Sequence, residues 1–105
     1  MHQEVKTVSE FDEAIKNGKV LVDFWATWCG PCMMMGQKIA DEIEPNFKDI
    51  KIVKINVDEA DPAIAARFGI MSIPALFCFV DGVKKAEFIG VTDTQKLVSA
   101  LSPSI

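Results

Sequence analysis

The chain has 105 residues, 50% of them hydrophobic and 25% charged, a globular composition that argues against a disordered, collagen-like or disulfide-dense protein. This length leaves room for one hydrophobic core, so we predict a single domain over residues 1–105. Eleven basic residues, scattered along the chain, face fifteen acidic ones, and the net charge of -4 argues against nucleic acid as a partner.

Nothing in the sequence predicts a membrane segment or a secretory signal. The uncharged stretch 68–80 is shorter than the roughly 20 apolar residues that span a bilayer, and it contains Gly69 and Pro74. Residues 1–4 supply neither a basic region nor an apolar one. We therefore expect a soluble cytoplasmic protein with no membrane partner.

The first elements are a strand, a helix and a second strand. Residues 4–8 predict a short strand, after which Ser9 caps a helix in a capping-box arrangement with Asp12, and Gly18 ends it. Residues 20–26 are almost continuously apolar, which is typical of a strand buried on both faces. We therefore place this strand at the centre of a sheet.

A longer helix is predicted to begin at Pro31. It carries an apolar side chain at every fourth position, namely Met35, Ile39, Ile43 and Phe47. Pro45 is expected to break or kink its last turn. The alternating segment 50–57 predicts the next strand, reached by a right-handed crossover.

Two further helices are indicated by their capping residues. Asp61 caps a short helix that has Pro62 at its first position and Gly69 just beyond its end. Thr92 and Gln95 form a second capping-box pattern, which opens a terminal helix.

The remaining segments, 73–80 and 83–89, flank Asp81 and Gly82, a pair of residues typical of a two-residue hairpin. These two strands should therefore pair antiparallel. The elements predict an α/β fold of order βαβαββα, with a central mixed sheet flanked by helices on both faces.

The candidate chemical site is formed by Cys29 and Cys32, at the junction of the strand 20–26 and the following helix. Ligands of open α/β sheets bind at such carboxyl ends of strands. Residues three apart on a helical turn are close enough for a disulfide. Because closing so short a loop stabilises the fold by only roughly 2 kcal/mol, we interpret the pair as redox-active rather than structural.

The helix start distinguishes the two thiols. At or just before the helix N-terminus, Cys29 meets unpaired N–H groups that favour a thiolate, so we assign it as the nucleophile. Cys32, one turn inside, should stay protonated and more buried, available to resolve a mixed disulfide. Gly30 allows a tight turn, and Pro31 suits the first helical position.

Zinc is the main alternative use of a Cys-x-x-Cys pair. A tetrahedral zinc site needs four ligands, and the chain offers only Cys78 and His2 besides. His2 is close to the terminus, and Cys78 lies within an apolar strand, where it is expected to act as a small buried hydrophobe. We therefore predict no metal site.

Residues 22–32, which read VDFWATWCGPC, resemble the active-site segment of the thioredoxin family. Further similar segments follow at the family's spacing, at 54–58, 68–75, 81–82 and 90. The Gly-Pro pair between the cysteines is similar to that of the reducing, cytoplasmic members. The resemblance implies a protein-disulfide reductase that binds no cofactor, is monomeric, acts on disulfide-containing proteins and receives electrons from a thioredoxin reductase.

Asp23 combines an argument from burial with one from the resemblance. Within the apolar strand its carboxylate must be desolvated, which should raise its pKa toward neutrality. The resemblance implies that Asp23 accepts the proton of the Cys32 thiol through water, and that Lys54 lies beside it and partly offsets its charge. The alternative is a carboxylate satisfied by backbone N–H groups, with no part in the chemistry.

The resemblance also implies a cis bond between Ile73 and Pro74, in a loop that faces the cysteines and binds the substrate backbone at Ile73. Trp28 is either a core aromatic or, as its place beside Cys29 favours, a partly exposed platform for partners. Trp25 is expected to pack within the protein.

Met33 and Met71 stand where many thioredoxins have basic residues. One hypothesis is that they form an apolar rim around the site, which widens partner tolerance and lowers dependence on charge. The other is that they pack inward, like Met34 and Met35. For the whole protein, the sequence predicts a thiol-disulfide oxidoreductase; the alternatives are a redox-inert binding subunit and a net oxidant or isomerase.

Overall fold

The computed structural model describes residues 2–102; Met1 and residues 103–105, which the predicted domain includes, lie outside the described part. Its strands are β1 (His2–Glu4), β2 (Lys19–Trp25), β3 (Ile50–Asn56), β4 (Ala75–Val80) and β5 (Val83–Ile89). Its helices are α1 (Val8–Ala14), α2 (Gly30–Lys38), the π-helical turn η1 (Ile39–Ile43), α3 (Pro62–Arg67) and α4 (Thr94–Leu101).

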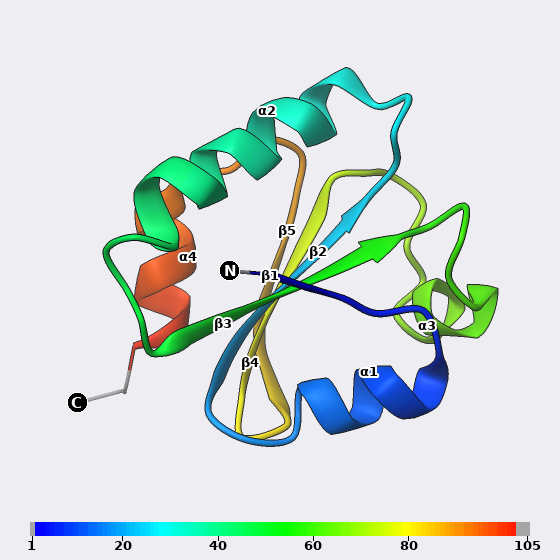
Figure 1. Cartoon of the computed structure of the whole chain (residues 1–105), viewed down its shortest axis with the longest axis horizontal. Helices are drawn as coiled ribbons and strands as arrows, with labels where there is room; N and C mark the ends of the chain where they lie inside the picture. Colours follow the sequence, from blue (N-terminus) through cyan, green and yellow to red (C-terminus); the bar gives the residue numbers. More distant parts are fainter. Residues whose placement is uncertain (1, 103–105) are drawn as a thin grey trace.

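The strands form one mixed sheet in the order β1-β3-β2-β4-β5 (Figure 1). Strands β1, β3 and β2 run parallel, whereas β4 is antiparallel to both β2 and β5. The expected βαβαββα order begins at β2, and β1 and α1 precede it, as the first residues also indicate. The α/β class, the mixed sheet and the central place of β2 are confirmed.

Side chains alternate along β2 between two separate cores. Val20, Val22 and Phe24 belong to the cluster beneath α1 and α3. Leu21 belongs to the other cluster, which α2, η1 and α4 cover. Because the side-chain period of a strand is two, Asp23 faces α2 together with Leu21. The sheet therefore carries its one buried carboxylate on the face covered by α2 and α4.

The start of α1 differs from its prediction. Thr7, not Ser9, is the N-cap: its hydroxyl accepts a hydrogen bond from the Glu10 N–H at 3.1 Å. Glu10 in turn accepts from the Thr7 N–H at 3.0 Å, whereas Ser9 is exposed. The longer Glu side chain completes this reciprocal pair, so the helix begins at Val8 and the first strand ends at Glu4.

The other helix starts follow the prediction in one case and not in the other. Asp61 caps α3, and its carboxylate accepts from the Ala63 N–H, as expected. The cap of α4 is Asp93 rather than Thr92, because the Asp93 carboxylate accepts from the Gln95 N–H. The Thr92 hydroxyl donates instead to the Gly90 carbonyl.

The capping box of α1 gives a test of the corrected helix start. Replacing Thr7 with Ala should lower the free energy of unfolding by about 1 kcal/mol, because the Glu10 N–H loses its partner. The matched variant Ser9→Ala should change it by less than about 0.5 kcal/mol. Urea unfolding of both variants checks this, and an equal loss in the two would contradict the assignment of Thr7.

Candidate active site

Cys29 and Cys32 lie where the chain leaves β2 and enters α2. Cys29 is the N-cap of the helix, and its sulfur accepts a hydrogen bond from the Cys32 N–H at 3.1 Å. The Cα atoms of the two cysteines are 5.2 Å apart, and their sulfurs are joined in a disulfide. Gly30 takes the first helical position and Pro31 the second, one residue later than predicted.

Both sulfur-bearing residues are largely covered by protein. Cys32 is 1% exposed and Cys29 is 5% exposed, and both pack with Ala26 in a small apolar cluster. Cys32 is the deeper of the two, in the order that the sequence predicts. A partner that reaches this pair therefore approaches from the side of Cys29.

The loop before β4 lies against Cys29. Its Ile73–Pro74 peptide bond is cis, as the resemblance implies. The Ile73 carbonyl oxygen is 3.8 Å from the Cys29 sulfur, and the Pro74 carbonyl accepts from the Gly90 N–H at 2.8 Å. The loop is thereby tied to the end of β5 while Ile73 remains beside the disulfide.

Asp23 is completely buried and its charge is not compensated by hydrogen bonds. It is 0% exposed, and within residues 2–102 neither carboxylate oxygen has a hydrogen-bond partner. Burial raises the pKa of Asp23 to about 6; Lys54 opposes the rise and Glu4 adds to it. The alternative of a carboxylate satisfied by backbone N–H groups is therefore wrong.

Lys54 is the pairing neighbour of Asp23 on β3. Its Nζ atom lies 4.8 Å from the centre of the Trp25 ring, where a cation–π interaction holds it. A cavity of about 270 Å³ is lined by both residues of this pair and by His2, Gly36, Ile39, Ala40, Glu44 and Ile52. Since one water needs about 30 Å³, this cavity has room for several beside Asp23.

Trp28 is 69% exposed, so it is not a core aromatic and its predicted exposure is confirmed. Its indole Nε1 donates to the Asp58 carboxylate at 2.7 Å, which fixes the ring beside Cys29. No local sequence pattern assigns Asp58 a role, because this contact joins residues 30 positions apart. Trp25, by contrast, is half-buried, as expected of a packing residue.

An apolar groove of about 230 Å³ lies beside Trp28. It is lined by Trp28, Val57, Ala65, Ile70, Met71, Ser72 and Ile73. The sequence suggested Trp28, Met71 and Ile73 for this surface. It missed Val57, which follows β3, and Ala65 of α3, because only the fold brings these segments together. Ile70 and Ser72 flank Met71 in the loop before β4.

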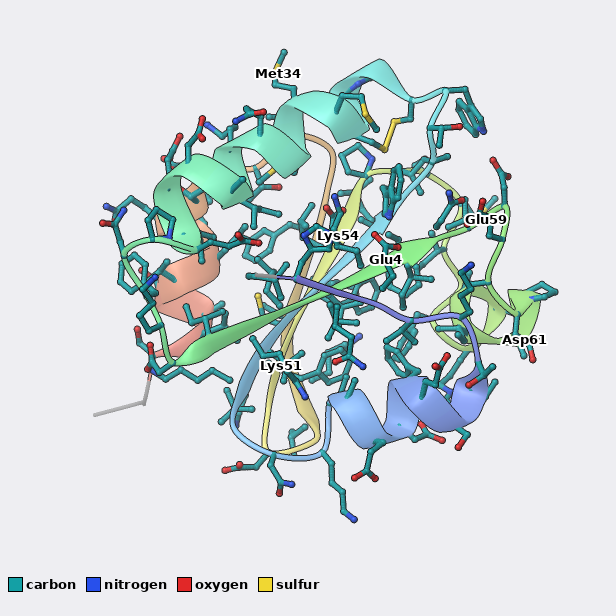
Figure 2. All side chains as sticks on the ribbon, viewed as in Figure 1. Glu4, Met34, Lys51, Lys54, Glu59 and Asp61 are labelled. Carbon is teal, nitrogen blue, oxygen red and sulfur yellow. A yellow bond between two sulfur atoms is a disulfide. The ribbon has the colours of Figure 1, made fainter. Side chains whose placement is uncertain are left out.

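The methionines divide between core and surface. Met35 is buried, as expected, and accepts the Thr92 N–H with its sulfur. Met33 is 46% exposed and Met71 is 96% exposed, which favours the rim hypothesis for both. Met34, expected to pack inward, is 59% exposed, and Figure 2 shows it pointing away from the sheet on the outer side of α2. Met34 occupies the solvent side of the helix because Met35 fills the core position.

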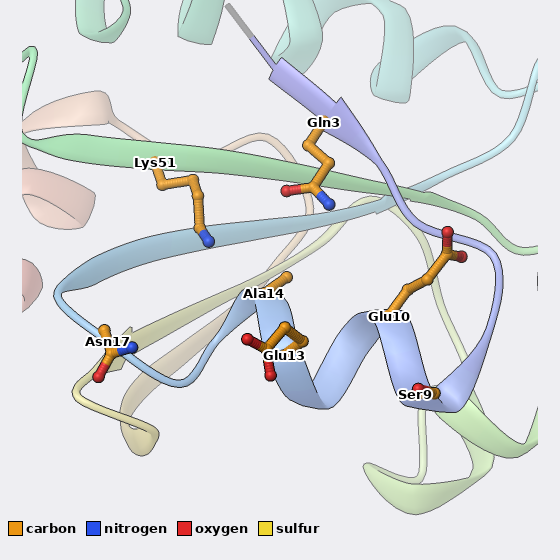
Figure 3. Close-up of a pocket in the computed structure, with 7 residues that line it drawn as sticks. All are labelled: Gln3, Ser9, Glu10, Glu13, Ala14, Asn17 and Lys51. Atoms are coloured by element: carbon orange, nitrogen blue, oxygen red, sulfur yellow. The ribbon is translucent and has the colours of Figure 1, made fainter.

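A larger hollow lies away from the cysteines. It measures about 500 Å³ and opens between α1 and the strands β1 and β3 (Figure 3). Its lining residues are Gln3, Ser9, Glu10, Glu13, Ala14, Asn17 and Lys51, with no cysteine among them. We therefore assign the chemistry to the smaller hollows beside Trp28 and Asp23.

Cys78 and His2, the two further ligands that a zinc site at the cysteine pair would need, do not lie together with Cys29 and Cys32. Cys78 is fully buried in the cluster beneath α4, and burial raises the pKa of its thiol to about 11. Across residues 2–102, no three His, Cys, Asp or Glu side chains are arranged to hold a metal ion. Within the same residues, no helix has the length and apolar character needed to cross a bilayer.

Comparisons with known proteins agree with this geometry. The thioredoxin family model matches residues 2–103. A thioredoxin of Pyropia yezoensis is 44% identical over 104 residues, which are 97% of this chain and 95% of the relative. A thioredoxin of Griffithsia pacifica is 43% identical over 96 residues, which are 89% of this chain and 86% of the relative.

Solved structures give the same result. The oxidised mitochondrial thioredoxin 3 of Saccharomyces cerevisiae is similar to this chain, with a TM-score of 0.83 and 33% identity. The similarity covers 95% of this chain and 92% of the yeast one. The chain therefore belongs to the thioredoxin family and is a thiol-disulfide oxidoreductase, a protein-disulfide reductase whose redox pair is Cys29 and Cys32.

Proposed function

We propose that Cys29 is the attacking nucleophile of this reductase. The observation that carries the proposal is the hydrogen bond from the Cys32 N–H to the Cys29 sulfur at the first turn of α2. In the reduced protein this N–H and the positive end of the helix dipole stabilise a thiolate at Cys29. Its place on the outer side of the pair makes it the sulfur that a target reaches first.

The reaction moves two electrons from the cysteine pair to the target. The Cys29 thiolate attacks one sulfur of a target disulfide, forming a mixed disulfide, and the released target thiolate takes up a proton. Cys32 then loses its proton and attacks the Cys29 sulfur, which breaks the mixed disulfide. The target leaves as a dithiol, and Cys29 and Cys32 remain joined.

Asp23 is proposed as the acceptor of the Cys32 proton through water in the adjoining cavity. A carboxylate with a pKa of about 6 is mostly ionised near neutral pH, so it can accept a proton and afterwards release it to solvent. Lys54 tunes it from the neighbouring strand. The missing hydrogen bonds to Asp23 support this role, since a carboxylate held by fixed donors would be a weaker base.

Target chains are proposed to bind along the groove beside Trp28, with their backbone against Ile73 and the cis Pro74. Gly30 and Pro31 complete the active-site turn. We infer that electrons come from a thioredoxin reductase and that no bound cofactor is needed. We further infer one domain over residues 1–105 that acts as a cytoplasmic monomer without membrane partners. We also infer that it does not bind nucleic acid, which the net charge of -4 supports.

The nucleophile assignment predicts different behaviour of the two cysteine variants. Cys32→Ser should accumulate a mixed disulfide with a target, because nothing resolves it, whereas Cys29→Ser should form none. In the reduced protein near pH 7, Cys29 should be alkylated roughly tenfold faster than an unperturbed thiol of the same exposure. Mass spectrometry follows both reactions, and trapping through Cys32 would contradict the assignment.

Asp23→Asn tests the proton acceptor. The second step, attack by Cys32, should slow by roughly 100-fold at neutral pH, the lower end of the range of general-base effects. The first step should change little, because Cys29 is stabilised by the helix start. Single-turnover measurements separate the two steps; equal slowing of both would show that Asp23 does not serve the resolving thiol.

The same variant has a stability signature. The folded-state pKa of Asp23 lies above the usual 3.8, so the folded state holds the proton more tightly than the unfolded one. Stability is therefore lost as pH rises from about 4 through about 6, by about 3 kcal/mol in all. Asp23→Asn should raise the free energy of unfolding by a similar amount at pH 7 and little at pH 4. Asp49→Asn is an exposed control with the opposite sign: the Lys19 hydrogen bond lowers the pKa of Asp49, so any loss of stability in this variant should grow as pH rises.

The exposed methionines should make target reduction insensitive to salt. For acidic targets, Met33→Lys and Met71→Lys should raise the rate at low ionic strength, and that gain should fade within the range where salt screens surface charges. Val83→Lys, at an exposed position of the β4–β5 hairpin, is the control. Rates across ionic strength check this, and identical salt dependence in all four proteins would eliminate the rim hypothesis.

A further inference from the structure

Three charged side chains stand in one row across three neighbouring strands. The register pairs Glu4 of β1 with Lys54 of β3, and Lys54 with Asp23 of β2. Directly paired residues project to the same side of a sheet, so all three face α2. Figure 2 shows Glu4 and Lys54 side by side below that helix. The lysine is therefore flanked by two carboxylates, one at the sheet edge and one at its centre.

The two carboxylates differ in their surroundings. Asp23 is 0% exposed and lines the cavity described above, with both oxygens unpartnered within residues 2–102. The Glu4 side chain is 41% exposed at the edge of the sheet. A charge near Asp23 acts through a poorly screened interior, so even a neighbour at the edge alters the balance between its two protonation states.

Lys54 lies between the two carboxylates, and its ammonium group rests on an aromatic ring. Its Nζ atom lies over the Trp25 ring, and 3.4 Å from where a Cβ on Gly36 would be. Among the described residues, neither Asp23 nor Glu4 forms an ion pair with it. The ammonium group therefore acts on both through space, and the negative charge of Glu4 offsets part of its effect on Asp23.

We propose that Glu4 is a positioning residue for the proton chemistry of Asp23: from the outer strand it counteracts Lys54 and keeps Asp23 protonated to higher pH. The proposal rests on the role of Asp23 proposed above. The remaining titratable groups that line this cavity are His2 and Glu44. His2 lies 3.7 Å from the Glu4 carboxylate and 3.9 Å from that of Glu44. A protonated His2 therefore weakens the effect of Glu4, and a neutral one leaves it at full strength.

The test is the titration of Asp23 in the oxidised protein, followed by the ¹³C shift of its side-chain carboxyl. At low salt, Glu4→Gln should lower the midpoint by roughly 0.3 to 0.5 pH unit, because a negative charge about 10 Å away is removed. Glu4→Asp, which keeps the negative charge, should leave the midpoint close to that of the unsubstituted protein. Glu13→Gln, on α1 across the sheet, removes the same charge and should leave the midpoint unchanged.

A second measurement separates this proposal from the one on which it rests. The pH profile of the resolving step should move with the Asp23 midpoint in Glu4→Gln. An unchanged midpoint, or an equal shift in Glu4→Asp, overturns the role of Glu4 while Asp23→Asn still slows resolution. If Asp23→Asn has no kinetic effect but the midpoint still moves, the proton-acceptor role fails and the electrostatic coupling stands. Circular dichroism confirms that each variant keeps its fold.

Discussion

Helix α2 begins directly after Cys29 because the central strand delivers the chain there and Pro31 has no N–H to leave unpaired. β2 is hydrogen-bonded to β3 on one side and to β4 on the other, which fixes the place where the following helix begins. The first-turn N–H of Cys32 has no partner within the helix and points to the Cys29 sulfur instead. The same junction thus ends a strand, starts a helix and places the positive end of the helix dipole beside the Cys29 thiolate.

The burial of Asp23 opposes the rest of the fold. A carboxylate in a central strand weakens the native state at neutral pH, and no hydrogen bond within residues 2–102 compensates it. An apolar residue there would pack as Leu21 does on the same face. The strand tolerates the carboxylate because Lys54 partly offsets its charge and the adjoining cavity has room for water. The buried carboxylate of Asp23 therefore lowers the stability of the fold at the position where the proposed chemistry needs a base.

Local patterns in the sequence were enough to predict the elements and the cysteine pair. The apolar run of β2, the Asp81–Gly82 turn and the Asp61 cap depend on neighbouring residues only, and these predictions agree with the structure. Where two caps competed within three residues, as at Thr7 and Ser9, side-chain length decided between them. The capping-box pattern prefers Glu at the third helical position, so the sequence itself favours Thr7 over Ser9.

Contacts between residues far apart in the chain could not be predicted from the sequence. Trp28 meets Asp58 only because parallel strands β2 and β3 end at the same edge of the sheet. Glu4 faces Asp23 only through the register of β1 with β3, and a shift of one residue would turn it to the other face. Periodicity predicts which side of a strand a residue occupies, but not which residues of other strands lie opposite it.

The groove beside Trp28 and the cavity beside Asp23 share no lining residue. The groove is built from α3 and the loop before β4, whereas the cavity lies between α2, η1 and the β1 edge of the sheet. A target confined to the groove and the Cys29 sulfur therefore covers none of the residues that line the cavity. On the proposed mechanism, the proton that Cys32 loses can leave through this side while the target is still bound. Electrons and protons then cross different surfaces of the protein, and a target confined to the groove does not block the second step.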